Sequence, residues 1–333
     1  MRKYRLQEAP YCVTPELTEG CNLQCSFCGL NGIRKEGPDR NYKFMTKKTM
    51  ESLMSQMAEL GWNSRIEFAM RGEPTMNPDF IELVAIAHKH RPKAHKLMIS
   101  NGGGLLGGKG PKYNIPALFD AGINVLALDN YHHARLVPKI LERIGIMPSG
   151  GDHPLGFKYF DYPEDISGNP HQRRPPGTKM LVIIQDISDQ AKAGNHGHLY
   201  NYAGCGFPKN NDRAGQRCHQ PFRQLAVRYD GTVAICCNDW RGVYKCGSVV
   251  KDGVAAVWQG AALGAAREYL IRGDRDALQP CAGCDHRTFR PGLLPDKLGK
   301  ATMHKPDKQT RADADAAIAG KPWATVVKRS WEV

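Results

Sequence analysis

The chain has 333 residues, of which 41% are hydrophobic, so it can bury the core of a globular protein. It contains no run of about 18 apolar residues and no apolar signal segment at its start, which predicts a cytoplasmic protein without a membrane span. The formal net charge is +13. This excess favours an anionic substrate or partner, nucleotides and nucleic acids included, although a solvated basic surface accounts for it equally well.

Short apolar runs alternate with amphipathic segments along most of the chain. Strands are expected at residues 11–17, 65–70, 96–100, 124–129, 156–162 and 180–186. Helices are expected at 46–61, with Thr46 as N-cap and Gly61 as stop, and at 78–90 and 115–122. This alternation predicts an α/β fold in which the strands form a partial (β/α)6 TIM-like barrel. Loops that leave the carboxyl ends of such strands build the site.

A segment rich in Gly, Asn and His between Gly194 and Gly215 predicts a domain boundary. Beyond it, residues 218–240 predict a β-hairpin around a Tyr-Asp-Gly turn, and residues 254–273 predict one helix. The chain is therefore expected to divide into a barrel domain (1–200), a small cysteine-rich hairpin-helix subdomain (201–290) and a C-terminal tail (291–333).

The chain contains 11 cysteines, and several of them are separated by only two or three residues. In a cytoplasmic protein, this spacing is typical of metal-binding thiolates rather than of disulfides. Cys21, Cys25 and Cys28 directly follow the first predicted strand. A zinc site or a closed iron-sulfur cluster takes four protein ligands, so these three cysteines either have a distant fourth partner or leave one metal position open.

The spacing Cys21-x3-Cys25-x2-Cys28, with Phe27 directly before the last cysteine, resembles the signature loop of the radical S-adenosylmethionine (SAM) superfamily. The resemblance implies that the three thiolates hold three irons of a 4Fe-4S cluster and that SAM binds the fourth iron. One electron then cleaves SAM to a 5'-deoxyadenosyl radical, which abstracts hydrogen from a substrate. The electron is expected from a reducing partner such as flavodoxin or ferredoxin. A zinc site completed by a distant histidine or cysteine is the alternative.

A second motif supports the resemblance. Arg71-Gly72-Glu73-Pro74 follows the second predicted strand and is similar to the Gly-Gly-Glu-Pro element of the family, with Arg71 in place of the first glycine. The resemblance implies that Gly72 lets the backbone approach SAM and that Glu73 accepts hydrogen bonds from the ammonium group of SAM. Without the cysteine loop, the same residues would indicate an ordinary turn.

Further candidate SAM contacts lie at the ends of the third and fourth predicted strands. Ser100 and Asn101 occupy a position where family members often present a polar side chain to the ribose, and Asp129 ends the next strand. Ala127 stands where relatives commonly have serine, which puts a contact from that position in doubt. For Ser100, Asn101 and Asp129, a turn-stabilising role explains the residues equally well.

Candidate acid-base residues just beyond the fourth strand are Tyr131, His132 and His133. A second candidate set at the junction of the two domains consists of His196, His198 and Tyr202. Surface or packing roles are the alternative for both sets.

The C-terminal cysteines resemble the auxiliary-cluster extension of the same superfamily. The implied ligands of one auxiliary 4Fe-4S cluster, the second cluster of the chain, are Cys218, Cys236, Cys281 and Cys284. The larger extension, called SPASM, needs further cysteines, and none follows Cys284, so the shorter twitch domain is expected. A zinc ribbon made by the same residues is the alternative.

The remaining cysteines are expected to have other roles. Cys12 and Cys237 are predicted to be small buried apolar side chains, with Cys237 opposite Cys236 on its strand. Cys205 and Cys246 lie near the implied auxiliary site in the sequence and are reserve ligands.

A fully ligated auxiliary cluster has no open position for SAM, so it is expected to move electrons to or from a substrate radical. The resemblance therefore implies a radical SAM oxidoreductase that oxidises or modifies a carbohydrate, a nucleoside or a nucleic-acid base. Modification of a peptide side chain is an alternative, which is disfavoured because only about twenty residues precede the cysteine loop. A non-catalytic metal protein that binds nucleic acid and senses redox state is another alternative.

Overall fold

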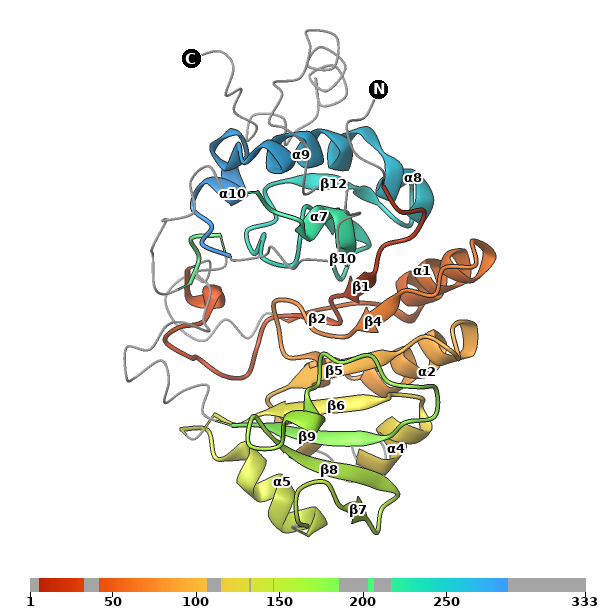
Figure 1. The fold of residues 1–333 in the computed structure, drawn as a ribbon, viewed down its shortest axis with the longest axis vertical. Helices are drawn as coiled ribbons and strands as arrows, with labels where there is room; N and C mark the ends of the chain where they lie inside the picture. Colours follow the sequence, from red (N-terminus) through yellow and green to blue (C-terminus); the bar gives the residue numbers. More distant parts are fainter. Residues whose placement is uncertain are drawn as a thin grey trace, which may run out of the picture.

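The computed structural model describes residues 6–32, 42–106, 115–131, 133–145, 147–185, 203–206 and 217–286. Its main feature is one large sheet with helices packed against it (Figure 1). The strands are β1 (Cys12–Pro15), β2 (Thr18–Glu19), β3 (Lys43–Phe44), β4 (Arg65–Glu67), β5 (Lys96–Ser100), β6 (Val125–Asp129), β7 (Asp152–His153), β8 (Phe157–Tyr162), β9 (Met180–Ile184), β10 (Gln224–Val227), β11 (Thr232–Ala234) and β12 (Lys245–Ser248).

The α-helices are α1 (Lys47–Glu59), α2 (Phe80–His90), α3 (Gly103–Leu106), α4 (Ile115–Asp120), α5 (Leu136–Ile144), α7 (Gln220–Arg223), α8 (Val254–Gln259), α9 (Ala261–Arg272) and α10 (Gln279–Ala282). Short 3-10 turns are η1 (Gly29–Gly32), η2 (Pro74–Met76), η4 (Ile166–Gly168) and η6 (Arg275–Ala277). All strands and helices predicted from the N-terminal part of the sequence are present, within a few residues of the expected bounds.

The large sheet has the strand order β12-β11-β10-β1-β4-β5-β6-β9-β8-β7. Neighbours from β10 to β8 are parallel, and the antiparallel pairs of this sheet lie at its two edges. The predicted α/β class with a large parallel sheet, consistent with a partial TIM-like barrel, is therefore confirmed.

From β1 to β6 the strands follow chain order, β9 then lies between β6 and β8, and β10 to β12 extend the sheet on the other side of β1. All residues of β9 are apolar, and four of them are buried, whereas β8 carries the exposed Lys158. A strand that is apolar on both faces gains most from a position inside a parallel sheet, where both faces are covered. This difference in composition accounts for the inner position of β9 and the outer position of β8.

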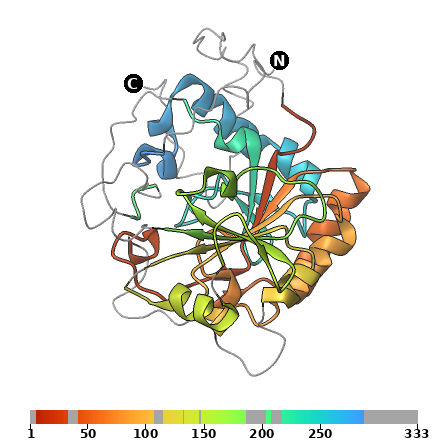
Figure 2. The ribbon, with the colours of Figure 1, turned by 60° about the horizontal axis from the view of Figure 1, so that its bottom comes forward.

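The first two long helices cover one face of the sheet (Figure 2). In α1, Met50, Leu53, Met54 and Met57 are buried in the main apolar core. The predicted N-cap is confirmed, because Thr46 Oγ1 accepts a hydrogen bond from the backbone N–H of Thr49 at 3.1 Å. The apolar stripe of α1 and its cap together anchor the helix that precedes β4.

The other face of the sheet is divided into an apolar and a polar half. Leu97, Val125 and Val182, from β5, β6 and β9, belong to a second apolar cluster. Over the neighbouring strands β1 and β10, the polar Thr14 and Gln224 are buried, and Gln224 Nε2 donates to Thr14 Oγ1 at 2.8 Å. This polar half borders the candidate site.

The C-terminal region continues the same sheet. Strand β10 pairs in parallel with β1 over the register Cys12–Gln224 to Pro15–Val227. The predicted hairpin is confirmed, since β10 and β11 are antiparallel and the turn contains Gly231 with a φ of 82°. The predicted boundary near residue 200 and the tail 291–333 lie largely or wholly outside the described residues.

The prediction of one helix at 254–273 is wrong, because the chain breaks at Gly260 into α8 and α9. Gly260 has an extended backbone, and a Cβ at this position would lie 2.5 Å from the carbonyl oxygen of Ala256. Glycine lacks the side chain that would clash there, so it permits the sharp change of direction.

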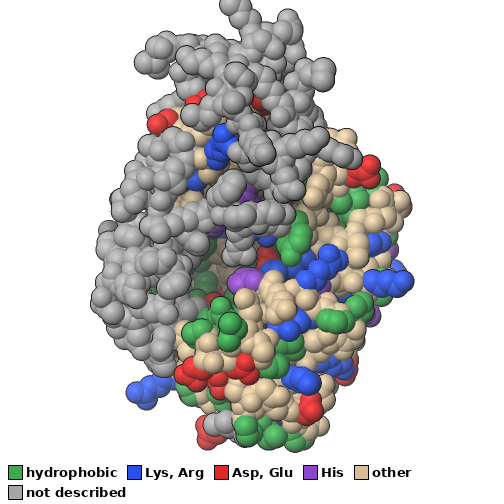
Figure 3. All heavy atoms as spheres, in the orientation of Figure 1, with side chains coloured by type: hydrophobic (Ala, Val, Ile, Leu, Met, Phe, Trp, Pro, Cys, Tyr) green, Lys and Arg blue, Asp and Glu red, His purple; other side chains and the backbone are tan. Residues whose placement is uncertain are grey.

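Basic side chains on the face seen in Figure 3 are spread among other types and do not merge into one patch within the described part of the chain. None of the described helices combines the length and the apolar character needed to cross a bilayer.

Candidate active site

The cysteine triplet lies in the loop between β2 and η1, across the molecule from α1 (Figure 1). Cys21, Cys25 and Cys28 line one cavity of ≈ 340 Å³, which we call the first cavity. Burial, with added repulsion from Glu73 and the other two cysteines, raises the pKa of Cys21 to about 12. Thiolates at this place therefore need positive charge beside them, which bound iron would supply.

Glu73 is buried at the wall of the first cavity and is held by a dense set of donors. Its Oε1 accepts from Thr75 Oγ1 at 2.5 Å and Ser100 Oγ at 2.6 Å, and its Oε2 accepts from the backbone N–H of Asn101 at 2.7 Å. Burial nevertheless raises the pKa of Glu73. Ser100, a predicted ribose contact, thus positions Glu73, and Oε2 keeps acceptor capacity for a further donor.

Asn101 joins the end of β5 to the cysteine loop. Its Nδ2 donates to Cys21 Sγ at 3.4 Å and to Asn22 Oδ1 at 2.9 Å, while its Oδ1 accepts from the backbone N–H of Gly103 at 2.8 Å. Asn101 therefore lines the first cavity as predicted, and its side-chain amide also orients Cys21.

Gly72 is required by a close approach of two backbone segments. A Cβ at Gly72 would lie 2.2 Å from the carbonyl oxygen of Thr18 and 2.5 Å from that of Gly20. The next backbone N–H, that of Glu73, donates to the Gly20 carbonyl at 3.0 Å. This glycine lets the loop after β4 pack against β2, a role in addition to the approach to SAM that the resemblance implies.

Arg71, which replaces the first glycine of the family motif, is buried among acceptors. It forms two hydrogen bonds to the carboxylate of Glu16, at 2.6 and 2.9 Å, and an ion pair with Glu19. Its Nη1 donates to the backbone carbonyl of Trp240 at 2.5 Å. Burial alone would raise the pKa of Glu19, but the charges of Arg71, Lys43 and Arg228 lower it to about 2. Arg71 thus ties the motif loop to the C-terminal region.

Asp129 lies at the end of β6 and faces the first cavity with Tyr131. Tyr131 donates its hydroxyl hydrogen to Asp129 Oδ2 at 3.1 Å, and its ring centroid lies 6.0 Å from that of Phe27. Burial raises the pKa of Asp129 to about 7 in spite of this hydrogen bond. The carboxyl group therefore changes its charge near neutral pH.

The other acid-base candidates are only partly described. His133 lies beside the triplet, with Nε2 3.9 Å from Cys25 Sγ. Four of these candidates, His132, His196, His198 and Tyr202, lie outside the described part of the chain.

A second cavity gathers the predicted auxiliary ligands Cys218, Cys236, Cys281 and Cys284. Burial and mutual repulsion raise the pKa of Cys236 and Cys281 well above the usual range, and that of Cys284 to about 11. Among the described residues, no three His, Cys, Asp or Glu side chains are grouped to hold a single metal ion. A set of four thiols is the ligand set of a 4Fe-4S cluster and also of a zinc ribbon.

The two cavities meet at the end of the hairpin. Cys236 lines the second cavity and Cys237 lines the first, so the predicted opposite orientation is present. Cys237 does not have the expected apolar packing, because its side chain lines the first cavity. Asn238, the next residue, lines both.

The other cysteines lie outside the second cavity. The reserve ligand Cys205 packs with Leu30 and Trp240, and Cys246 lies in the main core. Cys12 is buried as predicted, and its thiol donates to Glu67 Oε2 at 3.2 Å. All 11 cysteines lie in the described part of the chain as thiols rather than disulfides.

Replacing Arg71 with glycine, which restores the family motif, should destabilise the protein. The change leaves the carboxylate of Glu16, whose side chain is fully buried, without its cation. We expect a loss of about 3–5 kcal/mol in the free energy of unfolding, measured by urea titration. Arg71→Lys keeps the charge but not the planar guanidinium group, so its free energy of unfolding should lie between that of the wild type and that of Arg71→Gly. A loss below about 1 kcal/mol for Arg71→Gly would contradict this role.

Replacing Asp129 with asparagine should stabilise the protein at pH 8 more than at pH 5. The folded-state pKa of Asp129, about 7, lies above its ordinary value, so the protonated form favours folding and this contribution is lost as pH rises through 7. Because asparagine does not ionise, we expect a relative gain of about 1–3 kcal/mol at pH 8 by urea unfolding without added SAM. Tyr131→Phe, which removes the donor to Asp129, should enlarge the pH dependence. Identical pH profiles for wild type and Asp129→Asn would refute the assignment.

Comparison with known proteins agrees with these two sites. The family model described as Radical SAM superfamily matches residues 16–143, and the SPASM model, an iron-sulfur cluster-binding domain, matches residues 218–285. No curated protein has a significantly similar sequence.

Two solved structures have the same fold. The structure of BtrN in complex with AdoMet and 2-DOIA has a TM-score of 0.57 and 19% identity, and covers 83% of this chain and 93% of that one. SeMet BtrN in an open conformation has a TM-score of 0.54 and 16% identity, and covers 83% and 92%. The two family models together span more than half of the residues. The chain belongs to the radical SAM superfamily, as an enzyme with SAM and iron-sulfur cofactors and a SPASM-type domain in its C-terminal part.

Proposed function

We propose that this protein cleaves SAM in the first cavity and uses the radical to oxidise or modify a small substrate, with a second iron-sulfur cluster for electron transfer. The observation that carries the proposal is the juxtaposition of two thiol-lined cavities that share the wall residue Asn238. Substrate bound in the first cavity would lie next to both redox centres.

Cys21, Cys25 and Cys28 would hold the open cluster, which together with SAM supplies a 5'-deoxyadenosyl radical for hydrogen abstraction. Glu73 would accept a hydrogen bond from the SAM ammonium group through Oε2, since Oε1 is already occupied by Thr75 and Ser100. The network around Glu73 keeps the carboxylate oriented before SAM binds.

Asn101 and Asp129 would complete the SAM contacts from the ends of β5 and β6. Asn101 orients Cys21 and so acts on the cluster loop as well. Asp129 accepts a hydrogen bond from Tyr131, which favours the charged carboxylate and makes Tyr131 a positioning residue.

Cys218, Cys236, Cys281 and Cys284 would hold one auxiliary 4Fe-4S cluster, whose chemistry is single-electron transfer. The second cavity offers four thiols, which is the number that one 4Fe-4S cluster needs. This number supports the twitch form, which has one auxiliary cluster. Arg275 supports this group through the backbone, because its Nη1 donates to the carbonyl of Cys284 at 3.0 Å.

The substrate class that we favour is a small carbohydrate or nucleoside rather than a macromolecule. A cavity of ≈ 340 Å³ lies within the size range of small-molecule sites. BtrN, which has the same fold, is described in complex with both AdoMet and 2-DOIA. We further propose reduction by a flavodoxin or a ferredoxin and a cytoplasmic location.

Anaerobic reconstitution should give about eight irons per chain, because two clusters of four are proposed. The chain should also form 5'-deoxyadenosine from SAM under dithionite. Cys25→Ala should retain about four irons and form no deoxyadenosine, since the open cluster is lost. Cys246→Ala, a buried thiol outside both cavities, is the matched control and should keep all the iron. An iron content near four in the wild type would contradict the proposed auxiliary cluster.

Replacing Cys281 with alanine should separate the two cavities functionally. Removal of one thiol from the second cavity should lower the iron content to about four, while dithionite-dependent cleavage of SAM stays within about threefold of wild type. Iron analysis and deoxyadenosine chromatography on the same sample make the comparison. Complete loss of SAM cleavage with the first cluster intact would contradict this prediction, because it would show that SAM cleavage itself needs the second cluster.

A further inference from the structure

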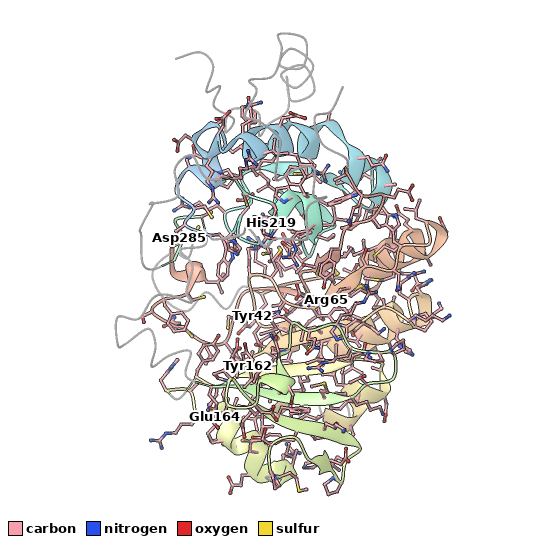
Figure 4. All side chains as sticks on the ribbon, in the orientation of Figure 1. Tyr42, Arg65, Tyr162, Glu164, His219 and Asp285 are labelled. Atoms are coloured by element: carbon pink, nitrogen blue, oxygen red, sulfur yellow. The ribbon has the colours of Figure 1, made fainter. Side chains whose placement is uncertain are left out.

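One wall of the first cavity has a set of polar residues that the SAM-binding motifs do not use. They come from β4, β10, the segment after η4 and the end of the hairpin, and they are Glu67, His171, Gln224, Cys237 and Asn238. Figure 4 places their neighbour Arg65 near the middle of the molecule, between His219 of the C-terminal region and Tyr162 of β8.

Glu67 is held in place from three sides. Arg65 forms an ion pair with Oε1, His171 Nδ1 lies 3.7 Å from the same oxygen, and the Cys12 thiol donates to Oε2 at 3.2 Å. Arg65 is almost fully buried, and Glu67 is 17% exposed. A carboxylate has about four acceptor positions, so these contacts leave acceptor capacity toward the cavity.

His171 extends this arrangement. Its backbone carbonyl accepts from Arg65 Nη1 at 2.6 Å, and Arg65 Nη2 lies 3.3 Å from its Nδ1. Arg65 therefore fixes both the carboxylate and the imidazole, while His171 remains about half exposed and lines the cavity. A carboxylate and an imidazole that are fixed by one guanidinium form a preorganised binding pair.

Asn238 gives an independent sign that a ligand belongs at this wall. Its residue is 5% exposed, and its Nδ2 has no hydrogen-bond partner among the described residues. Buried polar groups are almost always paired, so a donor without a partner in a cavity wall indicates a missing acceptor. An oxygen-bearing ligand in the first cavity or a cluster sulfur in the second cavity would supply it.

The charges of the first cavity differ from those of the whole chain. The chain carries a formal charge of +13, but the acidic residues that line this cavity are Glu67, Glu73 and Asp129. The charge of Arg71 is opposed by Glu16 and Glu19, and the charge of Arg65 by Glu67. An anionic group would therefore find no cation without a carboxylate partner among the described lining residues, whereas a hydroxyl or an ammonium group can donate to the carboxylates.

We propose that Glu67 and His171 anchor the substrate through a hydroxyl or amino group, and that this wall selects neutral or cationic polyhydroxylated molecules over anionic ones. The proposal rests on the proposed function, because it takes the first cavity as the place of reaction. It narrows the substrate to amino or neutral sugars and related alcohols, and it disfavours nucleotides and nucleic acids.

The charge of the cavity can be measured without turnover, with the Cys237 thiol as reporter. The reconstituted protein is treated anaerobically with methanethiosulfonate reagents that carry an ammonium group, a methyl group or a sulfonate group, and mass spectrometry follows Cys237. Cys237→Ser gives the background. Relative to a small free thiol, the cationic reagent should react at least about tenfold faster than the anionic one.

Glu67→Gln should reduce this cation-to-anion ratio at least about threefold, whereas Glu51→Gln, which removes an exposed carboxylate outside the cavity, should not change it. The proposal is overturned if the anionic reagent reacts as fast as the cationic one, if neither reaches Cys237, or if Glu67→Gln leaves the ratio unchanged. Where Glu67→Gln fails to fold because Arg65 has lost its partner, the His171→Ala comparison in the sugar series below decides.

Binding of a matched sugar series tests the anchor itself. Glucosamine, glucose and glucuronate share a ring and differ in charge, and calorimetry on the SAM-loaded protein should rank them in that order. His171→Ala, a half-exposed position, should weaken glucosamine binding about tenfold and leave SAM binding unchanged. Tighter binding of glucuronate, or no binding of any member, contradicts the proposal. Failure to cleave SAM would instead contradict the proposed function.

Discussion

The parallel pairing of β1 with β10 is the constraint on which both sites depend. It brings residues 12–15 beside residues 224–227 from a distant part of the chain, and the backbone N–H of Glu16 extends the pairing to the Val227 carbonyl at 2.8 Å. Strand β1 leads into the cysteine loop, and β10 leads into the hairpin that carries Cys236 and Cys237. One pairing of strands therefore sets the two groups of thiols at a common wall.

The pairing would be weak by itself, because it joins only four residues of each strand. Arg71 adds a second connection, since it bonds Glu16 beyond β1 and the Trp240 carbonyl beyond the hairpin. A buried guanidinium with two carboxylate partners is costly to desolvate, and it is retained where its geometry specifies one arrangement. Here that arrangement is the orientation of the SAM motif relative to the auxiliary thiols, so the departure from the family glycine has a structural reason.

The features that were predicted correctly from the sequence depend on local patterns. The period of α1, its Thr46 cap and the Tyr-Asp-Gly turn depend on neighbouring residues, and they formed as expected. Properties that depend on distant residues were missed. Arg71 was interpreted only as a departure from a motif, because Glu16 and Glu19 are neighbours in space alone. Glu67 lies in a short apolar run that predicted merely a strand, and two of its partners, Cys12 and His171, come from other segments.

The contrast between the basic chain and the acidic cavity links the fold to the chemistry. Basic side chains at the surface remain hydrated, so their charge reaches only about a Debye length into the solvent. Inside a partly enclosed cavity the dielectric constant is lower, and the nearest charges dominate. Glu67 and Asp129 line this cavity, whereas Arg65, which pairs with Glu67, does not. The +13 total is therefore a poor guide to the substrate, and the residues of one wall are a better guide.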